Sequence, residues 1–346
     1  MRTLVRISAL IVLLFAVASS FQLNNYNRKA LKTSTQLFSE AIPNDVSNIE
    51  DLPSSRVALR GLRSDRFRHP VDRQATAQLQ RLPGLEQIVR RATPLVEEAV
   101  YLDNIATSIK VGPGQMPALH QLLVDACRIL DIKDPPQLYV KQNPSPNAYT
   151  LAVQGRKPFI VLHTSLIDLM TPQEVQAVLA HELGHIKCEH GLWLSAANLV
   201  ALGLLAVGGV PGQLLSEALS SLIMPWQRAA ELTCDRAALL VAQDPAVVVS
   251  TILKLVGGVG GPALGEYGGV SPDEFLKQAE EYAAARSSRV GRLLAADQDR
   301  ALTHPLPVVR AQELARWARG PEYRGLLRRG APLAGGGGGG GEGLLC

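Results

Sequence analysis

The chain has 346 residues, and its 35 Lys and Arg against 31 Asp and Glu give a formal net charge of +4. The positive excess comes largely from the N-terminal segment and an Arg-rich C-terminal region, without a basic stripe interleaved with aromatic residues, so the composition argues against a nucleic-acid partner. Four cysteines lack close pairing and argue against a disulfide framework: Cys127, Cys188, Cys234 and Cys346.

Residues 1–39 contain no Asp or Glu and five Lys or Arg, a charge pattern typical of targeting segments. Ile7–Ala18 is nearly all apolar, as in a signal peptide, and Phe21–Phe38 is basic and rich in Ser, Thr and Asn, as in a plastid transit peptide. We therefore expect a bipartite signal that directs the protein to a plastid. A secreted protein or an N-terminal membrane anchor is the alternative.

The remaining chain divides by composition. Residues 40–78 are expected to form an irregular lead-in, and residues 79–330 a single folded domain. Residues 331–346 are expected to form a disordered tail, because the run Gly335–Gly341 has low complexity.

Three short runs rich in β-forming residues lie in the first half of this domain. They are Pro136–Val140, Ala148–Val153 and Phe159–His163, and Pro, Asn and Gly separate them. The pattern predicts a small antiparallel sheet that includes a hairpin centred on Gly155.

A helix is predicted to begin at Thr171, because Thr171-Pro172-Gln173-Glu174 combines an N-cap hydroxyl, a proline at the first helical position and a glutamate at the third. Apolar residues continue the helix at helical spacing: Val175, Val178, Leu179, Leu183 and Ile186.

This helix carries the sequence His-Glu-Leu-Gly-His at residues 181–185. Two imidazoles four residues apart lie on one helix face and can hold a single zinc ion. Glu182 then supplies a carboxylate that can take a proton from a water whose pKa the metal lowers to about 7, which is the chemistry of peptide hydrolysis. Two surface histidines on an amphipathic helix are the alternative, but the apolar neighbours indicate a buried position.

The helix itself offers no clear third protein ligand. A histidine six residues after His185 would fit one metallopeptidase subclass, but that position is Gly191, and His190 is one residue short. His190 is more consistent with a last helical turn than with a metal ligand.

A better candidate for the third ligand lies on a second predicted helix, Trp226–Ala238. Glu231 and Asp235 are four residues apart and share a face of this helix. Glu231 could complete a His, His, Glu site, and Asp235 could orient a ligand histidine. The alternative is a charged face paired with Arg228 and Arg236.

The segment between the two helices is predicted to form a hydrophobic helical hairpin over residues 192–226. Leu192–Val210 has no charged residue and about the length needed to cross a bilayer, and Pro211-Gly212 interrupts it. A hairpin buried in the domain is the first interpretation, and membrane association through residues 192–226 is the alternative.

Further motifs flank these helices: Asn147-Ala148-Tyr149 upstream, and His304-Pro305 followed by Arg310 downstream. With residues 181–185, Glu231 and Asp235, they form four separated motifs in order. Over roughly residues 80 to 320 the chain resembles the gluzincin zinc metallopeptidases that include the heat-shock protease HtpX and the CAAX prenyl endopeptidases, and it is most similar to their small plastid-type members.

The resemblance implies a role for each motif. One Zn²⁺ per chain would be bound by His181, His185 and Glu231. Glu182 would be the general base, Asp235 would orient a ligand, and His304 with Arg310 would stabilise the oxyanion. Apart from the resemblance, an extended substrate could add as a strand to the exposed edge of the predicted sheet, where Asn147, Ala148 and Tyr149 would bind it. A turn-forming asparagine after Pro146 is the alternative for Asn147.

The resemblance also implies an α+β, mainly helical fold, in which the zinc-binding helix lies beside the small antiparallel sheet and residues 79–330 are the metallopeptidase domain. The predicted function is zinc-dependent endopeptidase activity on peptides or unfolded proteins, in organellar protein quality control or turnover. A non-catalytic zinc-stabilised membrane or scaffold protein of the same fold, or an interaction module without metal, are the alternatives.

Overall fold

The computed structural model of the protein describes residues 55–81, 94–151, 157–197, 209–257, 269–292 and 304–333, together with the isolated residues 53, 84, 86, 87 and 294. The predicted targeting segment at residues 1–39, nearly all of the glycine-rich tail, the turn around Gly155 and residues 198–208 of the predicted hairpin lie outside the described residues. Of residues 94–97 and 209–222 only the backbone is described.

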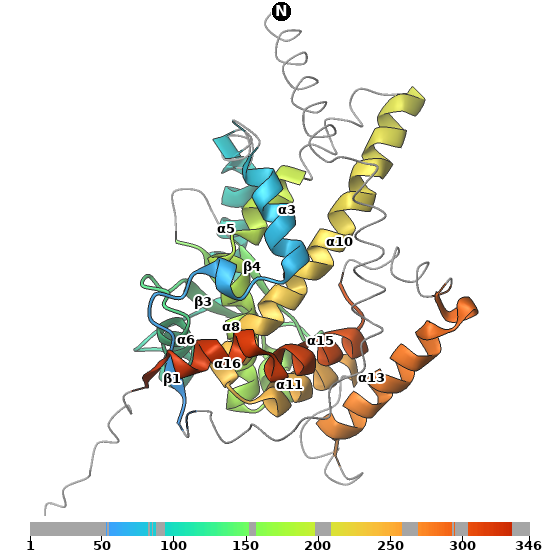
Figure 1. Cartoon of the computed structure of the whole chain (residues 1–346). Helices are drawn as coiled ribbons and strands as arrows, with labels where there is room; N and C mark the ends of the chain where they lie inside the picture. The colour runs from blue at the N-terminus through green and yellow to red at the C-terminus, as the bar shows by residue number, and fades with distance from the viewer. Residues whose placement is uncertain are drawn as a thin grey trace, which may run out of the picture.

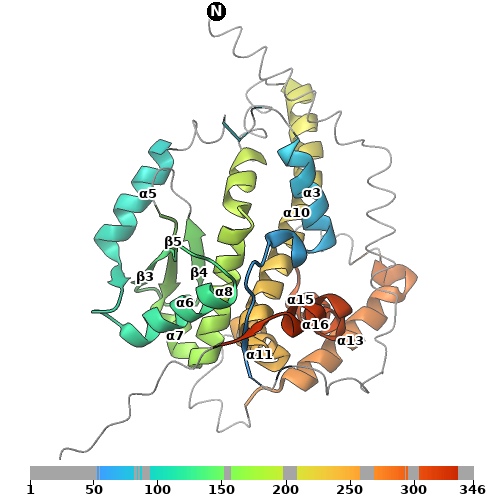
Figure 2. The same cartoon turned by 60° about the vertical axis from the view of Figure 1, so that its left-hand side comes forward.

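A mixed four-stranded sheet forms one side of the molecule, in the order β2-β3-β5-β4 (Figure 2). Its strands are β2 (Ile109–Val111), β3 (Gln137–Lys141), β4 (Ala148–Leu151) and β5 (Phe159–His163). The two outer pairs are antiparallel, and β4 with β5 is the pairing expected of the predicted hairpin. The central pair, β3 with β5, is parallel. The prediction of an antiparallel sheet was therefore wrong at this pair, because the chain passes to the outer edge at β4 and returns through β5 to the centre.

The two faces of the sheet bury different side chains, since successive residues of a strand point to opposite faces. Leu138, Val140 and Ile160 face the main core, which α6 (Pro117–Ile129), α7 (Thr164–Leu169) and α8 (Pro172–Lys187) also build. Tyr139 and Phe159 face α5 (Pro94–Thr107), where Tyr101 lies 6.1 Å from the Phe159 ring. All five residues of β5 are buried, as expected for a central strand.

The predicted start of α8 at Thr171 is confirmed. The Thr171 hydroxyl accepts from the Glu174 N–H at 3.4 Å, and Glu174 Oε2 accepts from the Thr171 N–H at 2.7 Å, so the two residues form a capping box. Glu174 also accepts hydrogen bonds from Ser250 and Lys254 of α11 (Pro245–Gly257), which tie the start of α8 to another helix. In Figure 2, α8 stands between the sheet and α10 (Gly209–Ala242).

The long helix α10 crosses α8 at Gly184. A Cβ added to Gly184 would lie 3.0 Å from Ala237 Cβ and 3.2 Å from Cys234 Sγ, so the two helices approach more closely than a larger residue permits. The second predicted helix, Trp226–Ala238, forms the C-terminal part of α10. Within the described residues, no helix combines the length and apolar character that a membrane span requires.

Helices α11, α13 (Pro272–Ser287), α15 (Pro307–Arg319) and α16 (Pro321–Arg328) form a cluster on the side of α10 away from the sheet (Figures 1 and 2). Each begins with proline, whose fixed φ and missing N–H suit the first helical position. Strand β6 (Ala331–Pro332) pairs with β1 (Val57–Ala58) and joins the two ends of the described chain. The predicted disordered tail, residues 331–346, is therefore structured at its first two residues, because they complete this strand pair.

Residues 57–78 of the predicted irregular lead-in, 40–78, are structured instead, together with residues 79 and 80. They form β1, the short 3-10 helix η2 (Ser64–Arg66) and α3 (Pro70–Gln80), which packs against α10. Phe67, between η2 and α3, is completely buried. An apolar pattern does not predict α3 because its buried face includes the polar residues Asp72 and Thr76.

Candidate functional site

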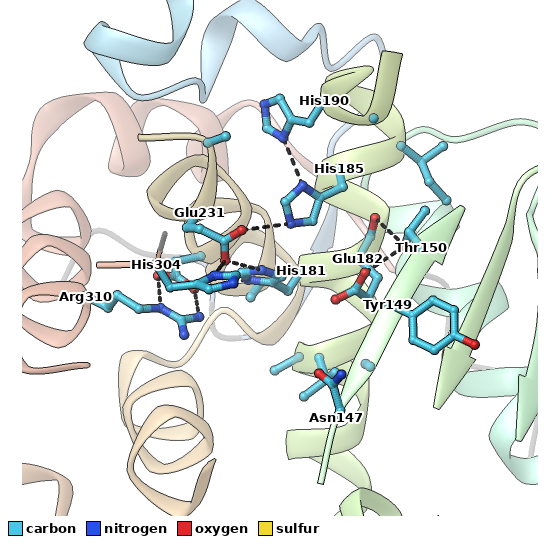
Figure 3. A pocket seen from close by; sticks show the side chains of 18 of the residues that line it. Asn147, Tyr149, Thr150, His181, Glu182, His185, His190, Glu231, His304 and Arg310 are labelled. Carbon is cyan, nitrogen blue, oxygen red and sulfur yellow. Dashed lines mark hydrogen bonds and ion pairs between the residues drawn. The ribbon is translucent and has the colours of Figure 1, made fainter. Parts of the chain in front are cut away.

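The two histidines of the α8 motif face Glu231 of α10 (Figure 3). His181 Nε2 lies 3.4 Å from Glu231 Oε2, and His185 Nε2 lies 3.5 Å from Glu231 Oε1. These distances are at the outer limit of a hydrogen bond, so the three groups border a common space instead of binding one another tightly. Two imidazole nitrogens and a carboxylate are a donor set that suits Zn²⁺ and leaves a fourth position open.

A second group of possible ligands shares the two histidines. One ligand atom each from His181, His185 and Cys234 lies within 4.8 Å of the others, among the residues that the structure describes. Burial raises the pKa of Cys234 well above its ordinary value, which keeps the thiol protonated, whereas metals bind the thiolate. The Glu231 carboxylate is ionised, its pKa held low by His181 and His304 despite burial, and it is therefore the better third ligand.

His181 is held at its other ring nitrogen. Its Nδ1 lies 3.1 Å from Asp235 Oδ1, and Arg310 of α15 donates to the same carboxylate from Nε at 2.9 Å and Nη2 at 2.7 Å. Although burial disfavours its charge, Arg310 holds the pKa of Asp235 at about 2. Burial also opposes a charge on His181, yet Asp235 and Glu231 raise its pKa to about 10. The electrostatic environment on this side of the site therefore strongly favours positive charge, as that of a metal-binding site does.

The predicted oxyanion residues both lie at this cluster, in contact with acidic partners. His304 Nδ1 is 3.2 Å from Glu231 Oε2, which raises the pKa of His304, and the side chain is 69% exposed. Arg310 uses Nε and Nη2 for Asp235. His304 is thus accessible from solvent, whereas Arg310 acts on the site through Asp235 and through its charge.

Glu182 points from α8 toward strand β4 (Figure 3). The Thr150 hydroxyl donates to Glu182 Oε2 at 2.7 Å, and burial raises the pKa of Glu182 above its ordinary value. A buried carboxyl with a raised pKa is poised to accept a proton. Thr150 was not predicted from the sequence, although strand alternation places it on the same face as Ala148.

These residues line one cavity of about 840 Å³. Asn147, Ala148 and Tyr149 line it as well, but the Tyr149 side chain points away from the histidines (Figure 3) and makes an edge contact with His163. The rest of the lining is largely apolar and includes Leu166, Val178, Leu192, Val248, Ile252 and Leu255. The cavity thus combines a polar cluster with apolar walls.

All seven residues predicted for metal binding and chemistry are therefore brought together: His181, Glu182, His185, Glu231, Asp235, His304 and Arg310. The contact between His185 and a buried histidine behind it was not predicted. His190 was predicted in a last helical turn, but α8 ends at Lys187 and His190 begins the next helical stretch, with its ring against His185.

Comparisons with known proteins show which family the chain resembles. Peptidase family M48 matches residues 113–318. The plastoglobule-localized metallopeptidase 48, chloroplastic, of Arabidopsis thaliana is 50% identical over 271 residues, covering 78% of this chain and 77% of its own. Protease HtpX homolog 2 of Methanosarcina acetivorans is 28% identical over 171 residues, covering 42% of this chain and 58% of its own.

Among solved structures, the Ste24p of S. mikatae aligns with a TM-score of 0.40 and 15% identity, over 72% of this chain and 60% of that chain. The family match extends over more than half of the chain, and the Arabidopsis relative aligns over most of both sequences. The chain therefore belongs to peptidase family M48, whose members are metallopeptidases.

Proposed function

We propose that the protein is a zinc-dependent endopeptidase that cleaves extended or unfolded polypeptides. The observation that carries this proposal is the convergence of His181 Nε2, His185 Nε2 and the Glu231 carboxylate on one space, in a cavity that Glu182 also lines. His181, His185 and Glu231 would hold one Zn²⁺. When bound, zinc supplies a Lewis acid that polarises the scissile carbonyl and lowers the pKa of water.

Glu182 is the general base in this proposal. Its carboxylate accepts a proton from the attacking water and passes it to the leaving amine. Two features support the assignment. Burial raises the pKa of Glu182, which strengthens it as a base, and the hydrogen bond from Thr150 fixes one carboxylate oxygen.

His304 and Arg310 stabilise negative charge on the substrate. His304 is exposed at the cavity and Glu231 raises its pKa, so the imidazole can donate a hydrogen bond to an oxyanion. Arg310 adds positive charge on the same side while it holds Asp235, and Asp235 in turn orients His181.

The substrate binds as an extended strand along β4. This strand is at the edge of the sheet and lies beside α8. Backbone groups of Asn147, Ala148 and Tyr149 can therefore form hydrogen bonds with a peptide and align it with the proposed metal ligands. The apolar walls of the cavity favour apolar substrate side chains near the cleaved bond. Unfolded proteins expose such segments, which agrees with a role in protein quality control.

The plastid is the proposed location of this activity. Residues 1–39 have the charge pattern of a bipartite targeting segment, and the Arabidopsis relative is described as chloroplastic and plastoglobule-localized. A fusion of residues 1–39 to a fluorescent protein should accumulate in plastids. Retention in the secretory pathway or at a membrane would favour the alternative location.

Cleavage of casein by the full chain tests the proposed activity, with zinc measured on the same sample. We expect about one zinc per chain. The Glu182→Gln variant should keep its zinc and lose cleavage, because the amide cannot accept the proton. Full activity of this variant would rule out the mechanism. Zinc in the wild-type protein without cleavage would favour a scaffold role, and a folded protein without zinc affinity would refute the proposed function.

A further inference from the structure

His190 lies directly behind the candidate metal centre. It is 4% exposed, its Nδ1 lies 3.2 Å from His185 Nδ1 (Figure 3), and its Nε2 lies 3.1 Å from Asp72 Oδ2. The ring therefore connects a proposed zinc ligand on α8 to a carboxylate on α3. The chemistry proposed above assigns no role to His190 or to Asp72.

Asp72 is completely buried and accepts hydrogen bonds from several directions. Besides His190, the donors are Trp226 Nε1 at 3.0 Å, Thr233 Oγ1 at 2.8 Å, Arg68 Nη1 at 3.1 Å and Thr76 Oγ1 at 3.1 Å. An ionised carboxylate can only accept hydrogen bonds. His190 Nε2 must therefore carry a hydrogen and donate it to Asp72.

The nearby Arg68 guanidinium does not compete for His190 Nε2. Its Nη1 lies 3.5 Å from that nitrogen, but this group donates its two hydrogens to Asp72 at 3.1 Å and to Thr76 at 3.0 Å. Its Nη2 donates to the Cys188 carbonyl at 2.6 Å. Arg68 thus fixes the carboxylate and the turn before His190 without contributing a hydrogen to the ring.

The position of one hydrogen determines the next. In a neutral His190 with hydrogen on Nε2, Nδ1 is an acceptor, and the facing His185 Nδ1 must donate. The Cys234 thiol, 3.6 Å from His190 Nδ1, is a weak partner at most. His185 then has no hydrogen on Nε2, and this nitrogen is the one that faces Glu231 Oε1. Its lone pair is directed to the space where the metal would bind.

We propose that Asp72 and His190 are positioning residues that fix the tautomer and the ring orientation of His185 for metal binding. The inference rests on the proposed zinc site. His181 has an analogous support, since its Nδ1 meets Asp235, which Arg310 holds. Each zinc histidine is thus backed by a carboxylate with an arginine, directly for His181 and through a second histidine for His185.

Zinc affinity of the full chain tests this proposal, measured by competition with a chromophoric chelator. Partners of this kind contribute about 10- to 100-fold to metal affinity, so His190→Leu and Asp72→Asn should each weaken Zn²⁺ binding by that factor. His190→Asn keeps an acceptor near the position of Nδ1 and should restore most of the affinity. Unchanged affinity in His190→Leu would overturn the proposal.

Thr76→Val is the matched control. It removes a hydroxyl from the same buried network but leaves the path from His185 through His190 to Asp72 intact. It should lower thermal stability and leave zinc affinity within about twofold of wild type, well below the 10- to 100-fold losses of the positioning variants. An equal loss of affinity in Thr76→Val would assign the network a structural role only.

Nitrogen-15 NMR of histidine in the metal-free wild-type protein gives a second test, which does not depend on the folding of a variant. His185 should carry its hydrogen on Nδ1, and His190 should carry its hydrogen on Nε2. Hydrogen on His185 Nε2 would overturn the inference. If the wild-type protein failed to bind zinc, the proposed function would fail, whereas normal zinc binding with unaffected positioning variants would overturn this inference alone.

Discussion

The hydrogen bond from Thr150 to Glu182 joins an edge strand to the proposed general base, at 2.7 Å between Oγ1 and Oε2. Burial raises the pKa of Glu182, and this hydrogen bond opposes the rise because it stabilises the ionised carboxylate. Thr150 thereby extends the pH range in which Glu182 can act as a base.

Replacing Thr150 with Val should narrow that range. A hydrogen bond to a charged group contributes about 1.5 kcal/mol, so the pKa of Glu182 should rise further and the acidic limb of kcat/KM should move up by about one pH unit. Activity should fall on the acidic side and approach the wild-type value at higher pH. The pH profile of kcat/KM for a peptide substrate measures the shift.

Thr150→Ser is the control for this change, since it keeps the hydroxyl. Its profile should match that of the wild-type protein. A shift of the same size in both variants, or in neither, would show that the Thr150 hydroxyl does not determine the pH of the acidic limb.

Local spacing explains why some site residues could be predicted and others could not. His181, Glu182 and His185 lie within five residues of one helix, so their convergence follows from helix geometry. Asp72 and His190 are 118 residues apart in the sequence, and their contact depends on how α3 packs against α10. Neither residue belongs to a pattern of spacing that would indicate such a contact.

The crossing of α8 and α10 determines the geometry of the proposed metal site at the scale of whole elements. Gly184 allows the close approach that brings Glu231 to the two histidines. The glycine of the α8 motif therefore has a packing function, separate from the chemistry of its neighbours.

Gly184→Ala should destabilise the protein by about 1–3 kcal/mol, because the added methyl group must displace Ala237 or Cys234 in a tightly packed interface. It should also weaken zinc binding, since α10 carries Glu231 and would be pushed away from α8. Urea unfolding of the metal-free protein and zinc competition measure the two effects.

Gly191→Ala is the matched control, in the helical stretch that follows α8. No atom lies within 4 Å of a Cβ added there, so alanine should be neutral or stabilising by about 0.5–1 kcal/mol. If Gly184→Ala were as stable as Gly191→Ala, the close approach would not limit the packing of the two helices.

Element boundaries followed from the sequence more readily than element pairing. The start of α8 is encoded by Thr171, Pro172 and Glu174. The parallel pairing of β3 with β5 was not predicted, because it depends on the chain passing β4 to the outer edge first. The alternation of apolar residues and the turn residues predict that two strands form a hairpin. They do not predict which further strand pairs with that hairpin.

At the scale of the whole molecule, the site connects helices that the chain order keeps apart. The proposed ligands come from α8 and α10, while Asp235 is held by Arg310 of α15 and His190 by Asp72 of α3. A metal ion bound between α8 and α10 would therefore stabilise contacts that reach the sheet-side core through α8 and the C-terminal helices through α15.

Metal removal should consequently lower the stability of the entire domain. A ligand that binds only the folded state at 100 times its Kd contributes about 2.7 kcal/mol, which corresponds to a melting temperature about 5–10 °C lower after chelation for a domain of this size. Thermal unfolding of the full chain with excess zinc, and again with a chelator, measures the difference. Glu231→Ala should melt at the same temperature under both conditions because it lacks a ligand, whereas Glu274→Ala, at an exposed position on α13, should retain the wild-type difference. A wild-type melting temperature that does not respond to chelation, or an equal response in Glu231→Ala, would show that zinc does not bind between α8 and α10 as proposed.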